Sequence, residues 1–116
     1  MIVRPHELSP IDFGGLKILD FTGGAEQSSS LALVTAPAGS AHPVAWSKRS
    51  DKYYYVLSGS LRFTLDAETV MLDAGDFCLV RRGRHFSYEN VGAVAAQLVL
   101  VHTPSFDLAA EVFASG

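Results

Sequence analysis

Short apolar runs recur along the chain at intervals of roughly ten residues, with turn-forming residues between them. Within many of these runs apolar and polar residues alternate, which is the pattern of a strand with one buried face. Many short strands at this spacing are typical of an all-β sandwich or barrel. The pattern predicts strands at residues 16–21, 30–36, 44–47, 53–57, 60–65, 70–72, 77–80, 85–88 and 94–102.

Two turns and one helix complete this prediction. Ser58 and Gly59 lie between two predicted strands, and we expect a hairpin there because glycine adopts positive φ at little cost. The Asp-Ala-Gly-Asp segment at 73–76 predicts a second tight turn. In the tail, residues 106–114, apolar side chains recur at three- and four-residue intervals, which is the spacing of a short helix.

Length and composition fit one domain over residues 1–116. The chain is 48% hydrophobic, which is enough for one compact core. Only 18% of residues are charged and the net charge is −3, so the chain lacks the basic surface that nucleic-acid binding requires. The first twelve residues do not have the pattern of a secretory signal, and no apolar run has the length of a membrane span. We therefore expect a cytoplasmic protein with no nucleic-acid or membrane partner.

Two segments punctuated by glycines resemble the paired motifs of the cupin family. The first motif, G-x5-H-x-H-x3/4-E-x6-G, matches at its two glycines, Gly39 and Gly59. The second, G-x5-P-x-G-x2-H-x3-N, matches at Gly75, Gly83 and Asn90. The resemblance covers nearly half of the chain. It implies an all-β, jelly-roll antiparallel β-barrel, to which the tail adds a short C-terminal helix.

The positions that hold a metal ion in many cupins carry other residues in this chain. They are Ala45 and Ser47 (or Trp46 and Lys48 with the shorter spacing), Lys52 and Phe86. Divalent ions need nitrogen and oxygen donors, and a lysine ammonium repels a cation. The resemblance therefore implies a member without a metal or other cofactor. A displaced metal site made of His42, His85 and Asp51 stays open as an alternative, since imidazole is a common ligand.

The alternation of side chains along a strand decides which residues share the barrel interior. If position 52 points inward, as the family's glutamate does, Tyr54 does too. If Phe86 points inward, so do Tyr88 and Asn90. With His42 these residues form an aromatic pocket with polar tips, which is common in small-molecule sites, whereas a register slipped by one residue would expose them. The expected substrate-binding residues are Lys52, Trp46, Phe86 and Asn90.

The chain also resembles the metal-free cupin dehydratases of pacidamycin-type nucleoside antibiotic biosynthesis, which remove water from a uridine 5′-aldehyde. This resemblance rests on Tyr-Tyr-Val-Leu-Ser-Gly at 54–59, on Tyr88 two residues after the lost motif histidine, and on Pro104-x-Phe106 followed by Glu111. The N-terminal lysine of those enzymes has no aligned counterpart here. The resemblance implies that the catalytic residues are His42, Tyr54, Tyr88 and Glu111.

The implied chemistry suits these side chains. Eliminating water β to a carbonyl requires a base for the α proton, a donor for the enolate oxygen and an acid for the departing hydroxide. We expect His42 as the base, Tyr54 or Lys52 as the oxyanion donor, and Tyr88 or Glu111 as the proton source. Isomerisation shares the first half of this mechanism, so these residues leave a dehydratase and an isomerase both open.

Two other functions stay open at this point. The first is a non-catalytic ligand-binding cupin, and the second is a metal-dependent enzyme with displaced ligands. In each case the expected partner is a small molecule, and the sequence is compatible with a monomer or a homodimer. The basic run at 81–85 suits either the steering of an anionic substrate or a solvated loop.

Overall fold

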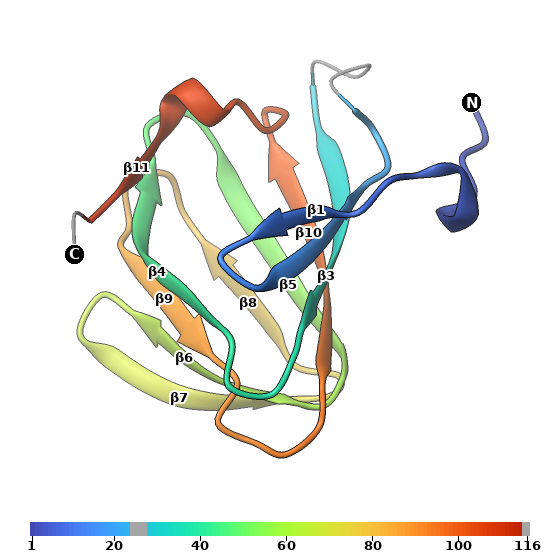
Figure 1. The fold of residues 1–116 in the computed structure, drawn as a ribbon. Helices are drawn as coiled ribbons and strands as arrows, with labels where there is room; N and C mark the ends of the chain where they lie inside the picture. The colour runs from blue at the N-terminus through green and yellow to red at the C-terminus, as the bar shows by residue number, and fades with distance from the viewer. Residues whose placement is uncertain (24–27, 115–116) are drawn as a thin grey trace.

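The computed structural model describes residues 1–23 and 28–114, and these residues form two antiparallel β-sheets that face each other (Figure 1). The six-stranded sheet has the order β1-β2-β3-β10-β5-β8, and the five-stranded sheet has the order β11-β4-β9-β6-β7. The strands are β1 (Ile11–Phe13), β2 (Leu16–Asp20), β3 (Ser30–Ala36), β4 (Ala41–Ser47), β5 (Asp51–Ser58), β6 (Ser60–Leu65), β7 (Glu68–Asp73), β8 (Phe77–Val80), β9 (Phe86–Glu89), β10 (Ala96–Thr103) and β11 (Glu111–Phe113). The predicted all-β barrel is confirmed.

The core lies between the sheets, where alternate residues of each strand are buried. Along β5, Lys52, Tyr54 and Val56 are buried while the residues between them are more exposed. Along β9, Phe86 and Tyr88 are buried in the same way. The inward-facing positions that we inferred from the family's motif are therefore confirmed on both strands.

A β-bulge in β4 changes the direction of one side chain. His42 pairs with Tyr88 and Ala45 pairs with Phe86, so two residues of β4 lie opposite one residue of β9. One of these two residues of β4 is Pro43, which has no N–H to donate and is tolerated at bulges. Because of the bulge, His42 and Ala45 both face the interior although two residues lie between them, a spacing that strict alternation would place on opposite faces.

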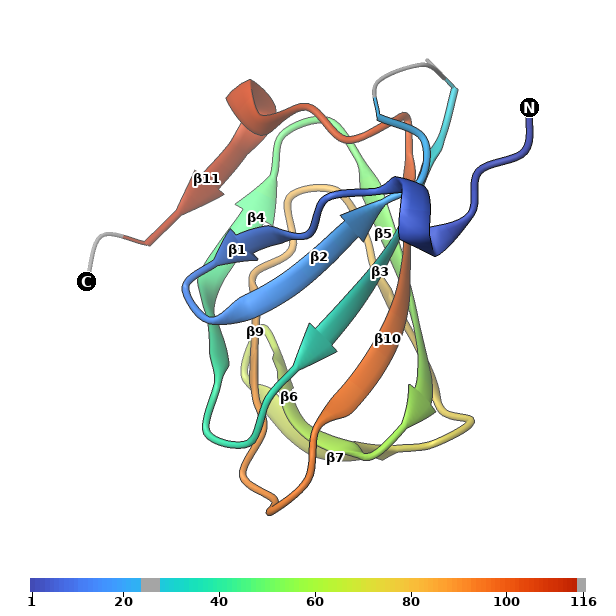
Figure 2. The same cartoon turned by 45° about the vertical axis from the view of Figure 1, so that its right-hand side comes forward.

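The C-terminal tail differs from the prediction. Only Leu108–Ala110 form a 3₁₀ turn, η2, in which the Asp107 side chain accepts a hydrogen bond from the Ala109 N–H at 3.0 Å. The chain then enters β11, which pairs with the edge of β4, with Glu111 opposite Ser47 and Phe113 opposite Ala45 (Figure 2). The edge of β4 has backbone N–H and C=O groups that need hydrogen-bond partners, and the tail provides them. Val112 and Phe113 are residue types that favour a strand.

The short strand β1 was not predicted. It forms a hairpin with β2 through Gly14 and Gly15, whose φ values of 58° and 98° suit glycine. The N-terminal 3₁₀ turn η1 (Pro5–Glu7) precedes this hairpin and stands away from the barrel, at the right of Figure 1. Among the described residues, neither 3₁₀ turn has the length that crossing a bilayer requires.

Candidate functional site

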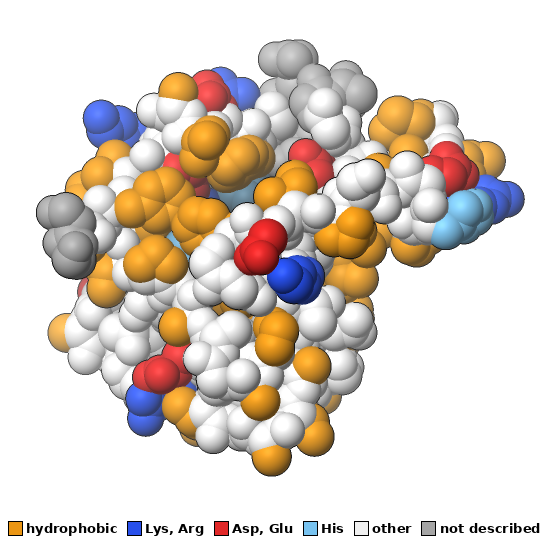
Figure 3. Space-filling view, in the orientation of Figure 1, with side chains coloured by type: hydrophobic (Ala, Val, Ile, Leu, Met, Phe, Trp, Pro, Cys, Tyr) orange, Lys and Arg blue, Asp and Glu red, His pale blue; other side chains and the backbone are white. Residues whose placement is uncertain are grey.

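A cavity of about 90 Å³ lies between the sheets at one end of the barrel, and we call it the inner cavity. Its polar lining residues are His42, Lys52, Tyr54, Tyr88, His102 and Glu111. A second cavity of about 290 Å³, the outer cavity, shares six lining residues with it, including Phe13 and Phe106. Figure 3 shows hydrophobic side chains gathered around a hollow near the top of this face, with a histidine side chain visible inside it.

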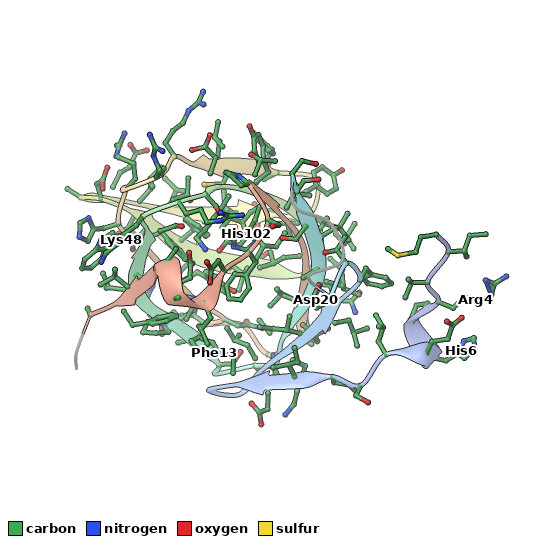
Figure 4. The ribbon with its side chains drawn as sticks, turned by 90° about the horizontal axis from the view of Figure 1, so that it is seen from above. Arg4, His6, Phe13, Asp20, Lys48 and His102 are labelled. Carbon is green, nitrogen blue, oxygen red and sulfur yellow. The ribbon has the colours of Figure 1, made fainter. Side chains whose placement is uncertain are left out.

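Different strands deliver the polar residues to this point. His42 on β4 lies directly opposite Tyr88 on β9, and Lys52 on β5 lies directly opposite His102 on β10. The view down the barrel in Figure 4 places His102 inside and Lys48 at the periphery. Because neighbouring strands fix these pairs, the backbone determines the arrangement of the side chains.

His42 is held in an aromatic cage with a defined tautomer. Its ring lies 4.9 Å from Phe86, 5.3 Å from Tyr88 and 5.3 Å from Phe13, measured between centroids. Its Nδ1 donates to the carbonyl oxygen of Pro43 at 2.7 Å. Since a carbonyl can only accept, Nδ1 carries the proton and Nε2 keeps its lone pair. Burial lowers the pKa of His42 to about 4, so the imidazole is neutral at physiological pH.

Two buried phenols, one from each sheet, also line the inner cavity. The rings of Tyr54 and Tyr88 meet edge to face with centroids 5.9 Å apart. Burial raises the pKa of both hydroxyls, and the neighbouring Tyr88 and Glu111 contribute to the shift at Tyr54. Both residues therefore keep their O–H proton and can donate a hydrogen bond.

Lys52, Glu111 and His102 form a buried polar cluster that also lines the inner cavity. The Lys52 ammonium pairs with the Glu111 carboxylate and donates to His102 Nε2 at 2.9 Å, and it lies 5.4 Å from the ring centroid of Phe86. Burial lowers the pKa of Lys52, and the Glu111 carboxylate opposes this shift. Burial, together with the Lys52 charge, lowers the pKa of His102 to about 3. The cluster thus holds a paired charge in a largely water-free site.

Sequence reasoning missed His102, although a signal was present. The residue ends the alternating buried series Ala96, Leu98 and Leu100 on β10, so strand parity alone directs it inward. The absence of a family motif at that position explains the omission.

The structure does not bring every expected residue to the cavity. Trp46 faces outward and packs on His85, with ring centroids 4.2 Å apart. Asn90 is buried elsewhere, where its amide nitrogen donates to the carbonyls of Ala36 and Val94 at 2.9 and 2.8 Å. These two residues therefore support the structure. Phe86 packs against His42 and Lys52 but is not among the residues that line either cavity.

The residues present do not fit a metal ion. The family's ligand positions Ala45, Ser47, Lys52 and Phe86 are all buried, and they offer one hydroxyl and a cation where ligands would be needed. The displaced set is also separated, because His85 packs outside on Trp46 while Asp51 accepts from the Arg82 N–H at 2.8 Å. Within residues 1–23 and 28–114, no three histidine, cysteine or acidic side chains gather as a metal site requires.

The fold and the buried site define a cupin barrel, and the comparisons agree. A model of the cupin domain family matches residues 32–102, so the chain belongs to that family. The structure is similar to that of Pac13 from Streptomyces, described as a nucleoside dehydratase, with a TM-score of 0.85 and 23% identity over 97% of this chain and 89% of that one.

Two curated relatives match over shorter stretches. The inner kinetochore subunit cnp3 of Schizosaccharomyces pombe is 31% identical over 77 residues, which are 66% of this chain and 12% of that protein. The tetracenomycin polyketide synthase protein TcmJ of Streptomyces glaucescens is 38% identical over 55 residues, which are 47% of this chain and 37% of that protein. The match thus spans a minor part of each relative's length.

Proposed function

We propose that this cupin is a metal-independent lyase or isomerase that removes a proton next to the carbonyl of a small polar substrate. One observation carries the proposal. His42 is a neutral imidazole whose Nδ1 is committed to the Pro43 carbonyl and whose ring lines a cavity with two protonated phenols. A base with a free lone pair and donors for a developing oxyanion are what enolisation requires.

Five of the six polar residues that line the inner cavity are assigned to this reaction. His42 Nε2 takes the α proton, and the electrons move to the carbonyl oxygen. Tyr54 or Lys52 donates to this oxygen, and their burial strengthens the interaction because little water competes. In a dehydration the enolate electrons then return and expel the β-hydroxide, which takes a proton from Tyr88; in an isomerisation the substrate carbon takes the proton instead. Glu111, whose carboxylate is paired with the Lys52 ammonium, has no proton of its own to give and holds this cation in place.

The sizes of the two cavities suggest which part of a substrate would occupy each of them. The inner cavity, at about 90 Å³, has room for the reacting carbonyl end only. The outer cavity, at about 290 Å³, approaches the roughly 300 Å³ lower limit of small-molecule sites and suits a larger, flatter group. A nucleoside or sugar aldehyde has this shape. Structures of Pac13 with uridine support nucleosides as the first class to test.

The test is exchange of the substrate α proton with solvent deuterium. Uridine 5′-aldehyde is incubated with the protein in D2O, and NMR and mass spectrometry follow deuterium incorporation and any loss of water. Exchange with loss of water identifies a dehydratase, and exchange with an altered configuration identifies an isomerase. Binding of uridine or its aldehyde without exchange would identify a binding protein and reject the proposal.

A further inference from the structure

A groove at one end of the six-stranded sheet is lined by three arginines that the proposed reaction does not use. It has a volume of about 380 Å³ and lies where β5 begins and where β8 and β10 end. Among the described residues, none that lines this groove also lines the inner or the outer cavity. We call it the arginine groove, and its lining residues are Arg49, Asp51, Arg81, Arg82, Thr103 and Pro104.

The arginine groove is positively charged although the whole chain has a net charge of −3. It holds three guanidinium groups and one carboxylate, that of Asp51, which leaves a formal charge of +2. The Asp51 carboxylate lies 3.6 Å from the Arg81 guanidinium. Within residues 1–23 and 28–114, neither Arg49 nor Arg82 forms an ion pair. Two of the three positive charges are therefore available to an anion.

Hydrogen bonds hold the segments around the arginine groove together. The Gly83 N–H donates to the Ser47 carbonyl at 2.8 Å, which joins the loop after β8 to the end of β4. The Ser50 hydroxyl donates to the Pro104 carbonyl at 2.7 Å, which joins the loop after β4 to the segment after β10. The backbone of the groove is thus set before a ligand arrives, and this lowers the entropic cost of binding.

The guanidinium of Arg49 is oriented by neutral partners. Its Nε donates to the Ser105 carbonyl at 3.0 Å, and its Nη2 donates to the Ser105 hydroxyl at 3.3 Å. These bonds fix the direction of the side chain and leave its charge uncompensated. The side chains of Arg81 and Arg82 are exposed. The groove therefore combines one oriented guanidinium with two that can adjust to a ligand.

We propose that the arginine groove binds the phosphate group of a phosphomonoester. Near neutral pH this group carries a charge of about −1.5 to −2 and three terminal oxygens that accept hydrogen bonds. The charge complements the +2 of the groove, and the oxygens suit the planar fork of a guanidinium. A carboxylate has one charge and two oxygens, so it would occupy a single fork and leave the groove positive.

The phosphate site is separate from the inner cavity. Asp51 and Thr103 are register partners, and each lies next to a residue that faces the barrel interior, Lys52 or His102. Because side chains alternate along a strand, Asp51 and Thr103 point away from that interior. The phosphomonoester is thus a second ligand, and the proposal does not depend on the reaction in the inner cavity.

Titration of ¹⁵N-labelled protein with inorganic phosphate, followed by NMR, tests the proposal. The backbone N–H signals of Arg82 and Gly83 should shift and reach saturation. Arg82→Gln and Arg49→Gln each remove one guanidinium, so each should raise the dissociation constant for phosphate by about 10-fold or more. Arg4→Gln is the control of equal charge, because Arg4 is exposed and lies beside η1, which stands away from the barrel. It should bind phosphate like the wild type.

A second comparison tests the class of ligand. At about pH 8 methyl phosphate is a dianion, whereas dimethyl phosphate and acetate are monoanions. We expect methyl phosphate to bind as tightly as inorganic phosphate, and both monoanions to bind about 10-fold or more weakly.

Three results would overturn the proposal. The first is a wild type whose Arg82 and Gly83 signals do not reach saturation with phosphate. The second is an equal phosphate affinity in the wild type and both groove variants. Arg82→Gln changes an exposed side chain and keeps the backbone N–H that donates to Asp51 at 2.8 Å, so its fold should be preserved and its affinity interpretable. The third is dimethyl phosphate or acetate binding as tightly as methyl phosphate.

Discussion

The Nδ1 atom of His42 donates to the carbonyl oxygen of Pro43, its neighbour in the chain, at 2.7 Å. Both residues belong to the bulged segment of β4. The bulge therefore has two effects: it turns the imidazole into the barrel, and it provides the carbonyl that fixes the tautomer. The Nε2 lone pair follows from a local backbone irregularity and needs no carboxylate partner.

Replacing His42 with glutamine should abolish the reaction and preserve the fold. Glutamine has no basic nitrogen, and general-base catalysis contributes about 10²- to 10⁴-fold, so α-proton exchange should fall by about that factor. The exchange rate in D2O and the melting temperature measure the two effects. His85→Gln is the control because that ring lies outside the cavity on Trp46. Wild-type exchange in the His42 variant would reject the proposed base.

The two phenols should separate the steps of the reaction. If Tyr54 steadies the enolate oxygen, Tyr54→Phe should slow α-proton exchange by roughly 10²-fold or more. If Tyr88 protonates the departing hydroxide, Tyr88→Phe should slow elimination and leave exchange almost unchanged. Measuring exchange and elimination in the same sample distinguishes these effects. Equal losses of both rates in both variants would show that the tyrosines act together on one step.

The alternation of side chains between the two faces of a strand accounts for the part of the site that could be predicted from the sequence. The motif glycines set the positions, and alternation then placed Lys52, Tyr54 and Tyr88 in one interior. The glutamate that meets Lys52 was expected on a helix, yet it reaches the cavity because β11 pairs with β4. Alternation could not predict this, since strand pairing between distant segments depends on which edge is free.

The bulge shows a second limit of sequence reasoning. An unbroken alternation along β4 would place His42 on the face opposite Ala45. The extra residue in β4 brings both to the same face. Pro43 is a local hint, because a proline inside a strand favours an edge or a bulge, but it does not say which neighbour turns inward.

Acid should destabilise the protein in a defined pH window. The folded-state pKa values of about 4 for His42 and about 3 for His102 lie below the unfolded value of about 6.5. As the pH falls below 6.5, the unfolded chain binds protons that the folded chain does not, so the free energy of unfolding decreases. Between about pH 6 and 5 the slope should approach about 2.7 kcal/mol per pH unit from these two groups.

Urea denaturation at a series of pH values measures this slope. His42→Gln removes one of the two histidines that bind a proton on unfolding, so the slope should be roughly halved. His85→Gln changes an exposed ring on the outer face and should leave it unchanged. A wild-type slope near zero in this window would mean that neither histidine is held neutral by burial.

Neutralising one partner of the buried pair Lys52 and Glu111 should lower the free energy of unfolding more than replacing both partners with uncharged residues. Glu111→Gln leaves the Lys52 ammonium without its counter-charge, and breaking a buried pair in this way costs about 3–5 kcal/mol of unfolding free energy. The double variant with Lys52→Met removes both charges and should be more stable than either single variant, as urea denaturation of all three will show. Glu89→Gln breaks the exposed pair with Arg62 and should cost less than about 1 kcal/mol. If Glu111→Gln costs no more than Glu89→Gln, water reaches the cluster, and Tyr54 rather than Lys52 would have to donate to the enolate oxygen.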